Sequence, residues 1–301
     1  MTVDRRQFLH AAVAASSTFA FAKQPAAAIE PIQRNGKPHL RLSIAAYSYR
    51  KYLDLKAKPQ PTMTLEDFAE IAAGLDLDAI EPTGYYFAET TPEYLARLKG
   101  KCTRLGLDIS GSAVGNNFCI SDPAKLKEQI AHVKKWTEHT SLLGGKALRV
   151  FAGNVEKGDT EEKARARCIE ALQECCDHAA KFGVFMALEN HGGIVTTADQ
   201  LLSIVKAVKH DWFGVNLDTG NFHSADPYAD LEKLVPYAVN VQIKTEIVRA
   251  NKQKEDADLK RLIDMLKQGG YRGYVALEYE AAEEPKTAIP KHIETLKKLV
   301  G

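Results

Sequence analysis

The sequence predicts an α/β fold of the (β/α)8 TIM-barrel type, in a single domain. From residue 39 onward, eight short apolar runs alternate with amphipathic helical runs, which is the order that a parallel sheet requires. No stretch rich in Pro, Gly or Ser separates these units into two domains. The loop after the first apolar run contains no glycine, whereas an open doubly wound sheet often has a glycine-rich first turn, so the closed barrel is preferred.

The eight runs are short and apolar, as buried strands are. They span residues 40–49, 77–84, 108–114, 147–153, 184–193, 213–221, 238–246 and 273–280. Segments between them, such as 64–75, carry apolar residues at three- and four-residue spacing, which is typical of helices packed on one face. Capping residues predict helix starts at Thr64, Asp122 and Asp226. Glycines predict helix ends at Gly106, Gly144–Gly145, Gly183 and Gly269–Gly270.

The composition is that of an ordinary globular protein. The 301 residues are 45% hydrophobic and 26% charged, and the net charge is +1, which provides no field for nucleic acid or an anionic membrane. The 5 cysteines are irregularly spaced, which fits neither a disulfide framework nor a zinc ribbon. Three of them, Cys168, Cys175 and Cys176, lie in one helical run and are expected to be buried as small hydrophobic side chains.

The first 22 residues are predicted to be an export signal outside the fold. Arg5 and Arg6 precede the apolar run 11–22, which ends in a small-x-small cleavage sequence at Ala20–Ala22. The paired arginines resemble the twin-arginine signal. The run is too short for a permanent membrane span, and no cysteine follows it to carry a lipid anchor.

The expected organisation is therefore a signal peptide (1–22), a linker (23–38) and the barrel (39–301). The protein is expected to be exported, to the periplasm of a bacterium, with no membrane anchor once the signal is removed. A homo-oligomer is compatible with this organisation.

Polar side chains end the last four predicted strands. Side chains alternate between the two faces of a strand, and in a barrel the carboxyl ends of all strands meet at one rim, where active sites lie. With the aliphatic side of each strand facing the helices, the inward residues of comparable depth are Glu189, Asp218, Gln242 and Glu278. By the same alternation His191, Lys244 and Arg149 also point inward.

Three carboxylates that converge in a barrel mouth repel one another, and each would cost several kcal/mol if buried without a partner. Lys244 and Arg149 supply some positive charge. A divalent cation with oxygen ligands explains the arrangement better.

Four segments resemble the xylose isomerase-like TIM barrel superfamily: "LEN" at 188–190, "LDTGN" at 217–221, "VQIKTE" at 241–246 and "ALEYE" at 276–280. The resemblance extends over about residues 39–300. This superfamily includes sugar phosphate isomerases and epimerases, ketose 3-epimerases, hydroxypyruvate isomerases, inosose dehydratases and endonuclease IV.

The resemblance implies a metal ion, often manganese, held by Glu, Asp, His and Glu. At the matching positions these are Glu189, Asp218, residue 242 and Glu278, with the two glutamates also acting as the acid/base pair on the substrate carbon. Glu81, in "AIEPTG", matches an acidic residue that lines the site in the family.

Gln242 departs from the family pattern, which commonly has His at this position. The Gln carbonyl is still a possible ligand, and three carboxylates with one amide oxygen suit Mn, Mg, Co or Ca better than Zn. Manganese is preferred among these because of the resemblance. Alternatively, Gln242 hydrogen-bonds only to a substrate hydroxyl.

Other residues are candidates for substrate binding. His191 and His223 could bind a hydroxyl group or transfer a proton, or His191 could orient its own loop. Tyr47, at the end of the first predicted strand, has a ring suited to the face of a sugar. Together with Lys244, Arg149 and Glu81, these complete the predicted substrate contacts. Residues 248–254, "VRANKQK", are expected to form a solvated loop rather than a phosphate clamp.

The predicted function is that of a metal-dependent isomerase or epimerase for a sugar or sugar derivative. It would remove the proton next to a carbonyl through a metal-stabilised enediolate. Three alternatives remain. A lyase or dehydratase for keto-sugars would use the same metal and glutamates, and a sugar-binding barrel would lack catalysis. An endonuclease IV-like enzyme would need more histidines and a basic groove, so no nucleic-acid partner is expected.

Overall fold

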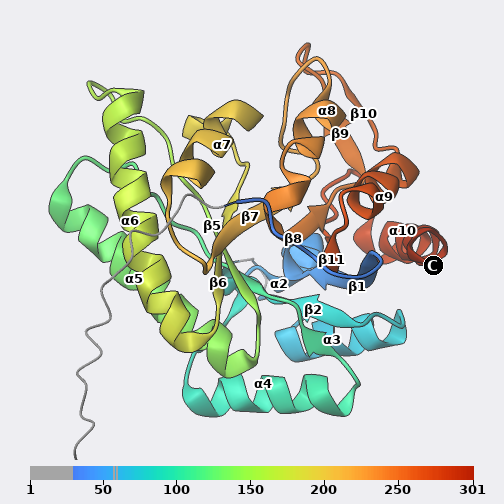
Figure 1. Ribbon diagram of the computed structural model, residues 1–301. Coiled ribbons are helices and arrows are strands. Elements are labelled where there is room, and N and C mark those ends of the chain that lie inside the picture. The colour runs from blue at the N-terminus through green and yellow to red at the C-terminus, as the bar shows by residue number, and fades with distance from the viewer. Residues whose placement is uncertain (1–29, 57, 59) are drawn as a thin grey trace, which may run out of the picture.

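The computed structural model of the protein describes residues 30–301 apart from residues 57 and 59 (Figure 1). The predicted signal peptide and the first part of the predicted linker lie outside these residues. None of the helices described is both long enough and apolar enough to cross a membrane.

A parallel sheet curves into a nearly closed barrel, which confirms the predicted fold class (Figure 1). Its strands lie in the order β3-β2-β1-β11-β8-β7-β6-β5-β4, and each pairs with its neighbours in parallel. Their bounds are β1 His39–Ala45, β2 Ala79–Glu81, β3 Asp108–Ile109, β4 Ser112–Ala113, β5 Ala147–Val150, β6 Phe185–Glu189, β7 Phe213–Asp218, β8 Ala238–Ile243 and β11 Arg272–Leu277.

The predicted third strand, 108–114, is divided into β3 and β4. A Cβ atom at Gly111, between the two pieces, would lie 2.7 Å from the carbonyl oxygen of Ala147, so only glycine allows this close approach to β5. β3 pairs with β2, and β4 pairs with β5. A bridge between Thr83 and Ala113 joins the two ends of the sheet, so the eight predicted strand positions close into one barrel.

Helices surround the strands (Figure 1). The longer ones are α3 Leu65–Gly74, α4 Pro92–Arg104, α5 Pro123–Leu143, α6 Glu161–Phe182, α7 Ala198–Ala207, α9 Leu259–Gln268 and α10 Pro285–Val300, with the short α2 Arg50–Leu53 and α8 Pro227–Glu232 in loops. The predicted helix starts are confirmed, because Thr64, Asp122 and Asp226 each accept a backbone hydrogen bond as N-caps. Gly144 and Gly183 end α5 and α6 in the left-handed conformation, as expected.

Several expected strands are too long at their carboxyl ends. β1 stops at Ala45, and Tyr47 and Tyr49 lie in the 3-10 turn η1 (Ala46–Tyr49) instead of ending the strand. The backbone turns there because the hydroxyl of Ser48 donates to the carbonyl of Leu277 and accepts from the amide of Tyr279, which fixes the loop to the end of β11. The apolar and aromatic residues that follow Ala45 are therefore the reason why the predicted first strand is too long.

The seventh strand also ends earlier than predicted, and the loop after it is more ordered. β8 stops at Ile243, and β9 (Glu246–Val248) pairs in antiparallel fashion with β10 (Lys254–Asp256). The segment 248–254, expected to be a solvated loop, is therefore mostly the turn of a hairpin.

The two faces of the strands differ as the alternation predicts. Met186, Leu188, Val215, Leu217, Val241, Ile243, Val275 and Leu277 are all fully buried in the apolar layer between sheet and helices. Many inward residues are polar, and the Ser43 and Ser110 hydroxyls lie 2.9 Å apart in the barrel interior. The barrel interior is therefore more polar than the apolar layer around it. The described cysteines are buried free thiols, which confirms the expectation for Cys168, Cys175 and Cys176.

Candidate active site

Strand register brings the predicted residues to the carboxyl rim of the barrel. Asp218, the last residue of β7, is directly opposite Gln242 of β8, and Glu189 at the end of β6 is opposite Asn216 of β7. Glu278 follows the last residue of β11, and its backbone amide donates to the carbonyl of Ile243, so the strand pairing continues to that residue. Glu189, Asp218 and Glu278 are all buried.

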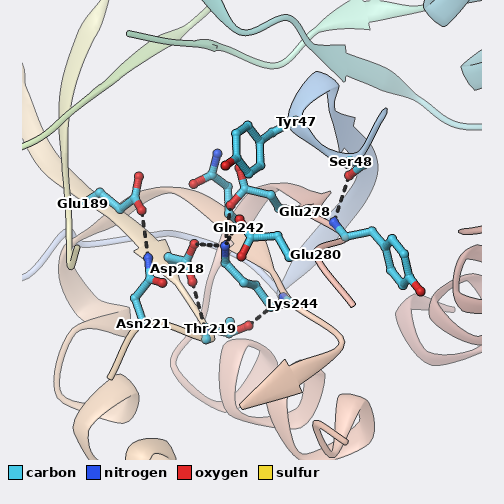
Figure 2. Close-up of polar contacts among 12 residues, drawn as sticks. Tyr47, Ser48, Glu189, Asp218, Thr219, Asn221, Gln242, Lys244, Glu278 and Glu280 are labelled. Atoms are coloured by element: carbon cyan, nitrogen blue, oxygen red, sulfur yellow. Dashed lines mark hydrogen bonds and ion pairs between the residues drawn. The ribbon is translucent and has the colours of Figure 1, made fainter. Parts of the chain in front are cut away.

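Lys244 is the cation at the centre of this group (Figure 2). Its Nζ lies 2.8 Å from Oε2 of Glu278, 2.9 Å from Oε1 of Glu280 and 3.3 Å from Oδ2 of Asp218. The backbone amide of Lys244 donates to Oγ1 of Thr219 at 2.8 Å, which holds the residue directly after β8 against the loop that follows β7. One ammonium group therefore contacts three carboxylates from two different strand ends.

Glu189 has a separate cation. Nε of Arg149, in β5, lies 2.9 Å from Oε2 of Glu189, and both side chains are buried. The amide of Asn221 donates to Oε1 of the same carboxylate at 2.9 Å (Figure 2). Glu189 and Glu278 thus face the site from different sides, each with its own positive partner.

These surroundings shift the pKa values of Glu189 and Glu278 in opposite directions. Burial raises the pKa of Glu189 to about 7, even though Arg149 opposes the shift. Burial alone would raise the pKa of Glu278 too, but Lys244 outweighs it and holds that pKa below its usual value. One carboxyl group is therefore suited to carry a proton near neutral pH, and the other to be ionised.

Among the described residues, the buried acids outnumber the buried lysine and arginine side chains. The acids are Glu81, Glu189, Asp218 and Glu278, and the cations are Arg149 and Lys244. A divalent cation would balance the excess. Oδ2 of Asp218 is buried, and in the described part of the chain it has the ion pair with Lys244 at 3.3 Å but no hydrogen bond. In charge and in donor type, Glu189, Asp218 and Glu278 therefore fit a divalent metal ion.

The side chains as they are placed do not yet form such a site. Within residues 30–301, apart from the two omitted positions, no three acidic, histidine or cysteine side chains are grouped closely enough to hold a metal ion. The contacts of Lys244 and Arg149 give the physical reason, because these cations occupy carboxylate oxygens that a metal would need. A metal ion would have to displace the ammonium of Lys244 from Asp218 and Glu278.

Gln242 belongs to a network beneath the rim. Its Nε2 donates to Oε1 of Glu81 at 2.5 Å, and its Oε1 accepts from Nδ2 of Asn216 at 2.7 Å. Asn240 donates to both Glu81 and Asn216, at 2.6 and 2.7 Å. Both polar atoms of the Gln242 amide thus have protein partners. Its role as a metal ligand stays a prediction that would use the second lone pair of its carbonyl oxygen.

Two cavities open at the rim. One, of about 220 Å³, is lined by Tyr47, Tyr85, Arg149, Phe151, Glu189, His191, Lys244, Glu278 and Glu280. The other, of about 270 Å³, is lined by Tyr47, Arg50, Gly220, Asn221, His223, Lys244, Thr245, Glu246, Val248, Lys254, Glu280 and Ala281. A larger hollow of about 380 Å³ lies on the outer surface around α8 and α9, away from these residues.

Most predicted substrate contacts reach these cavities. Arg149 and His191 line the smaller one, His223 lines the larger one, and Tyr47 and Lys244 line both. Glu81 does not, because it is fully buried beneath them with Asn240 and Gln242. Burial raises its pKa to about 7.

The sequence analysis did not single out several residues of the cavity linings, among them Tyr85, Phe151 and Asn221. Each lies in a loop directly after a strand, which is the signal that could have identified it. Phe151 packs against His191 with ring centroids 4.4 Å apart, so it also orients that histidine. Phe87, Phe118 and Trp136 are core residues.

Comparison with known proteins shows which family the chain matches. Residues 69–299 match the family model described as xylose isomerase-like TIM barrel. Inosose isomerase of Bacillus subtilis (strain 168) is 27% identical over 252 residues, which cover 74% of this chain and 90% of that protein. Relatives of the chain thus include a protein named as an isomerase.

Solved structures agree in fold. An L-ribulose 3-epimerase superposes with a TM-score of 0.69 at 17% identity, covering 87% of this chain and 94% of the other. A xylose isomerase-like TIM barrel protein from Mycobacterium smegmatis, in complex with magnesium, has a TM-score of 0.66 at 16% identity and covers 86% and 96%. On the strength of the family match, with the barrel and its rim of carboxylates, the chain belongs to the xylose isomerase-like TIM barrel family.

Proposed function

We propose that the protein is a divalent-metal-dependent isomerase or epimerase that moves a proton on the carbon next to a sugar carbonyl. The observation that carries the proposal is that two buried carboxylates, Glu189 and Glu278, line one cavity of about 220 Å³ and have different cationic partners. Two carboxyl groups in unlike surroundings are the usual arrangement of an acid and a base that act on one substrate. The names of the relatives, an inosose isomerase and an L-ribulose 3-epimerase, support the same reaction class.

Glu278 is the base in this proposal. Lys244 keeps this carboxylate ionised in the absence of metal, and a bound divalent ion would do so in its place, so Glu278 accepts the proton from the substrate carbon. The electron pair of the broken C–H bond moves onto the carbonyl oxygen and gives an enediolate. Glu189, next to Arg149, delivers a proton to the carbon from its own side. Tyr47, His191 and Arg149 would hold the hydroxyl and carbonyl groups of the sugar in place.

Glu189, Asp218 and Glu278 would hold the metal, with Gln242 as the predicted fourth ligand. A bound divalent ion would polarise the carbonyl group and stabilise negative charge on neighbouring oxygens. All of the expected donors are oxygen atoms, which favours Mn, Mg, Co or Ca over Zn. The magnesium complex of the Mycobacterium smegmatis protein supports a divalent ion in this family.

We also propose that the protein acts after export.

A second candidate shares the first step. If a leaving group lies on the carbon β to the carbonyl, the same enediolate would expel it, and the product would be that of a lyase or dehydratase. Glu189, with a pKa raised to about 7, would then protonate the leaving group instead of carbon. Product analysis separates the two reactions, because only elimination releases water or an alcohol. A sugar-binding barrel without catalysis would bind the sugar but give neither an isomerised product nor an elimination product.

The experiment that tests the proposal compares three variants on a panel of ketoses and keto-sugars with Mn²⁺ present. Glu278→Gln and Glu189→Gln should each lower kcat by about 10²–10⁴, the usual contribution of a positioned acid or base. Glu283→Gln, an exposed glutamate of the loop after β11 that contacts Lys291, is the matched control and should retain activity. Wild-type activity in both active-site variants would reject the proposed roles.

A further inference from the structure

The two cavities at the barrel rim are adjoining lobes of one recess. They share three lining residues, Tyr47, Lys244 and Glu280. The Lys244–Glu280 ion pair, at 2.9 Å, lies at their boundary. At about 220 and 270 Å³, each lobe alone is smaller than the ~300 Å³ at which small-molecule sites usually begin, whereas the two together fall in that range. The proton transfer proposed above uses only the smaller lobe, and the larger one has no part in it.

The wall of the larger lobe is built by ordered backbone. The β9–β10 hairpin is fixed to the loop that follows β7, because the amide of Ala250 donates to the carbonyl of Ser224 and Arg249 donates to the carbonyl of Ala225, both at 3.1 Å. Arg249 also pairs with Glu255 at 2.6 Å, across the hairpin. These contacts give the lobe a defined shape before any ligand arrives.

The chemistry of the lining suits a neutral, hydroxyl-rich group. Each lysine or arginine that lines the larger lobe already has oxygen partners. Lys244 contacts Glu280, Lys254 lies 3.3 Å from Glu246, and Arg50 donates to the carbonyl of Tyr279 at 2.9 Å. Lys244 and Lys254 are thus paired with carboxylates, and the guanidinium of Arg50 donates to backbone carbonyls of the loop after β11, so a phosphate group would have to compete with contacts that are already made. Asn221, Thr245 and Glu246 offer donors and acceptors instead, beside the apolar surface of Val248 and Ala281.

We infer that the substrate has two sugar-sized units, and that it is a glycoside whose keto unit enters the smaller lobe and whose second sugar enters the larger one. The inference rests on the proposed function for the identity of the smaller lobe as the reaction chamber. Tyr47 and the Lys244–Glu280 pair, which face both lobes, would lie near the bond that joins the two units.

The test is calorimetric titration of the full chain, loaded with Mn²⁺. The probes are D-fructose, D-fructose 6-phosphate and a set of disaccharides in which fructose carries a second sugar at O3, O4 or O6 (turanose, lactulose and isomaltulose). At least one disaccharide should bind at least tenfold more tightly than D-fructose. Equal binding of fructose, tightest binding of the phosphate, or no binding by any disaccharide would overturn the inference.

A matched pair of variants locates the effect. Val248→Trp places a large side chain in the larger lobe and should reduce the affinity for the disaccharide to that for fructose. Asn251→Trp, in the exposed turn of the same hairpin, should preserve the tenfold difference. An unchanged preference in Val248→Trp would also overturn the inference. Because titration measures binding alone, disaccharide preference without turnover would leave this inference standing and reject the proposed reaction.

Discussion

Nζ of Lys244 lies 2.8 Å from Oε2 of Glu278, and the same ammonium group is 3.3 Å from Oδ2 of Asp218. One cation from the end of β8 thereby holds two buried carboxylates that come from the strands on its two sides. Burial alone would lower the pKa of Lys244, but Asp218 and Glu278 raise it well above its usual value. Lys244 is therefore charged and is the electrostatic centre of the site in the absence of metal.

Replacing Lys244 should destabilise the metal-free protein strongly. Lys244→Met leaves buried carboxylates without their cation, which typically costs about 3–5 kcal/mol. The free energy of unfolding, measured with urea in the presence of a chelator, should fall by that amount. Lys254→Met removes an exposed lysine that lies 3.3 Å from Glu246 and should change stability by less than about 1 kcal/mol. Similar effects of the two substitutions would show that Lys244 has no special electrostatic role.

The amide of Gln242 should contribute to stability through Glu81 and Asn216. Gln242→Met keeps the approximate shape but leaves a buried acceptor and a buried donor unpaired, each at a cost of about 1–3 kcal/mol. Urea unfolding should show the loss, whereas Gln268→Met at the exposed end of α9 should stay within about 0.5 kcal/mol of wild type. Wild-type stability in Gln242→Met would mean that this network is not formed in solution.

Metal binding should depend on Asp218. Asp218→Asn removes a charge from the carboxylates expected to hold the ion, and the affinity for Mn²⁺ should fall by at least about tenfold. Electron paramagnetic resonance of free Mn²⁺ measures this without an activity assay. Asp264→Asn, at a partly exposed position of α9 where the carboxylate pairs with Lys260, is the matched control. Equal Mn²⁺ affinity in the two variants would place the metal elsewhere.

His139 should make a destabilising contribution in mild acid. The ring packs against Trp136 at 5.4 Å in α5, and its Nδ1 is buried without a hydrogen-bond partner among the described residues. Burial, assisted by Lys135, lowers the pKa of His139 in the folded state. Below the usual histidine pKa of about 6.5, the unfolded chain therefore binds a proton that the folded chain does not.

The raised pKa values of Glu81 and Glu189 act in the opposite direction, so the contribution of His139 is read as a difference between variants. Between pH 7 and pH 5, the free energy of unfolding of the wild type should fall relative to that of His139→Phe, which cannot bind that proton. His132→Phe, at an exposed position of the same helix, should keep the wild-type slope. An identical pH dependence in His139→Phe and wild type would contradict this assignment.

The strands and the inward carboxylates could be predicted because the alternation of side chains between the two faces of a strand depends only on neighbouring residues in the sequence. Glu189, Asp218 and Glu278 were placed at one rim from parity alone, and the strand pairing confirms their common position. Parity also identified Arg149 as inward, and the structure adds its contact with Glu189.

Partners and strand ends could not be predicted in the same way. Gln242 contacts Glu81, which is 161 positions away, and no local pattern encodes that distance. The stop of β1 before Tyr47 depends on Ser48 bonding to the end of β11, a contact made only when the barrel closes. Tyr85 and Phe151 were missed because an aromatic residue in a loop has the same local signature as one in the core.

The most direct measurement is the isotope content of the product formed in D2O. The wild-type protein, with Mn²⁺ and a substrate from the panel, should give a product with one deuterium on the carbon next to the carbonyl, seen by proton NMR and mass spectrometry. Glu278→Gln should give none above background. Product formed by the wild type without deuterium on that carbon would contradict proton transfer through Glu189 and Glu278.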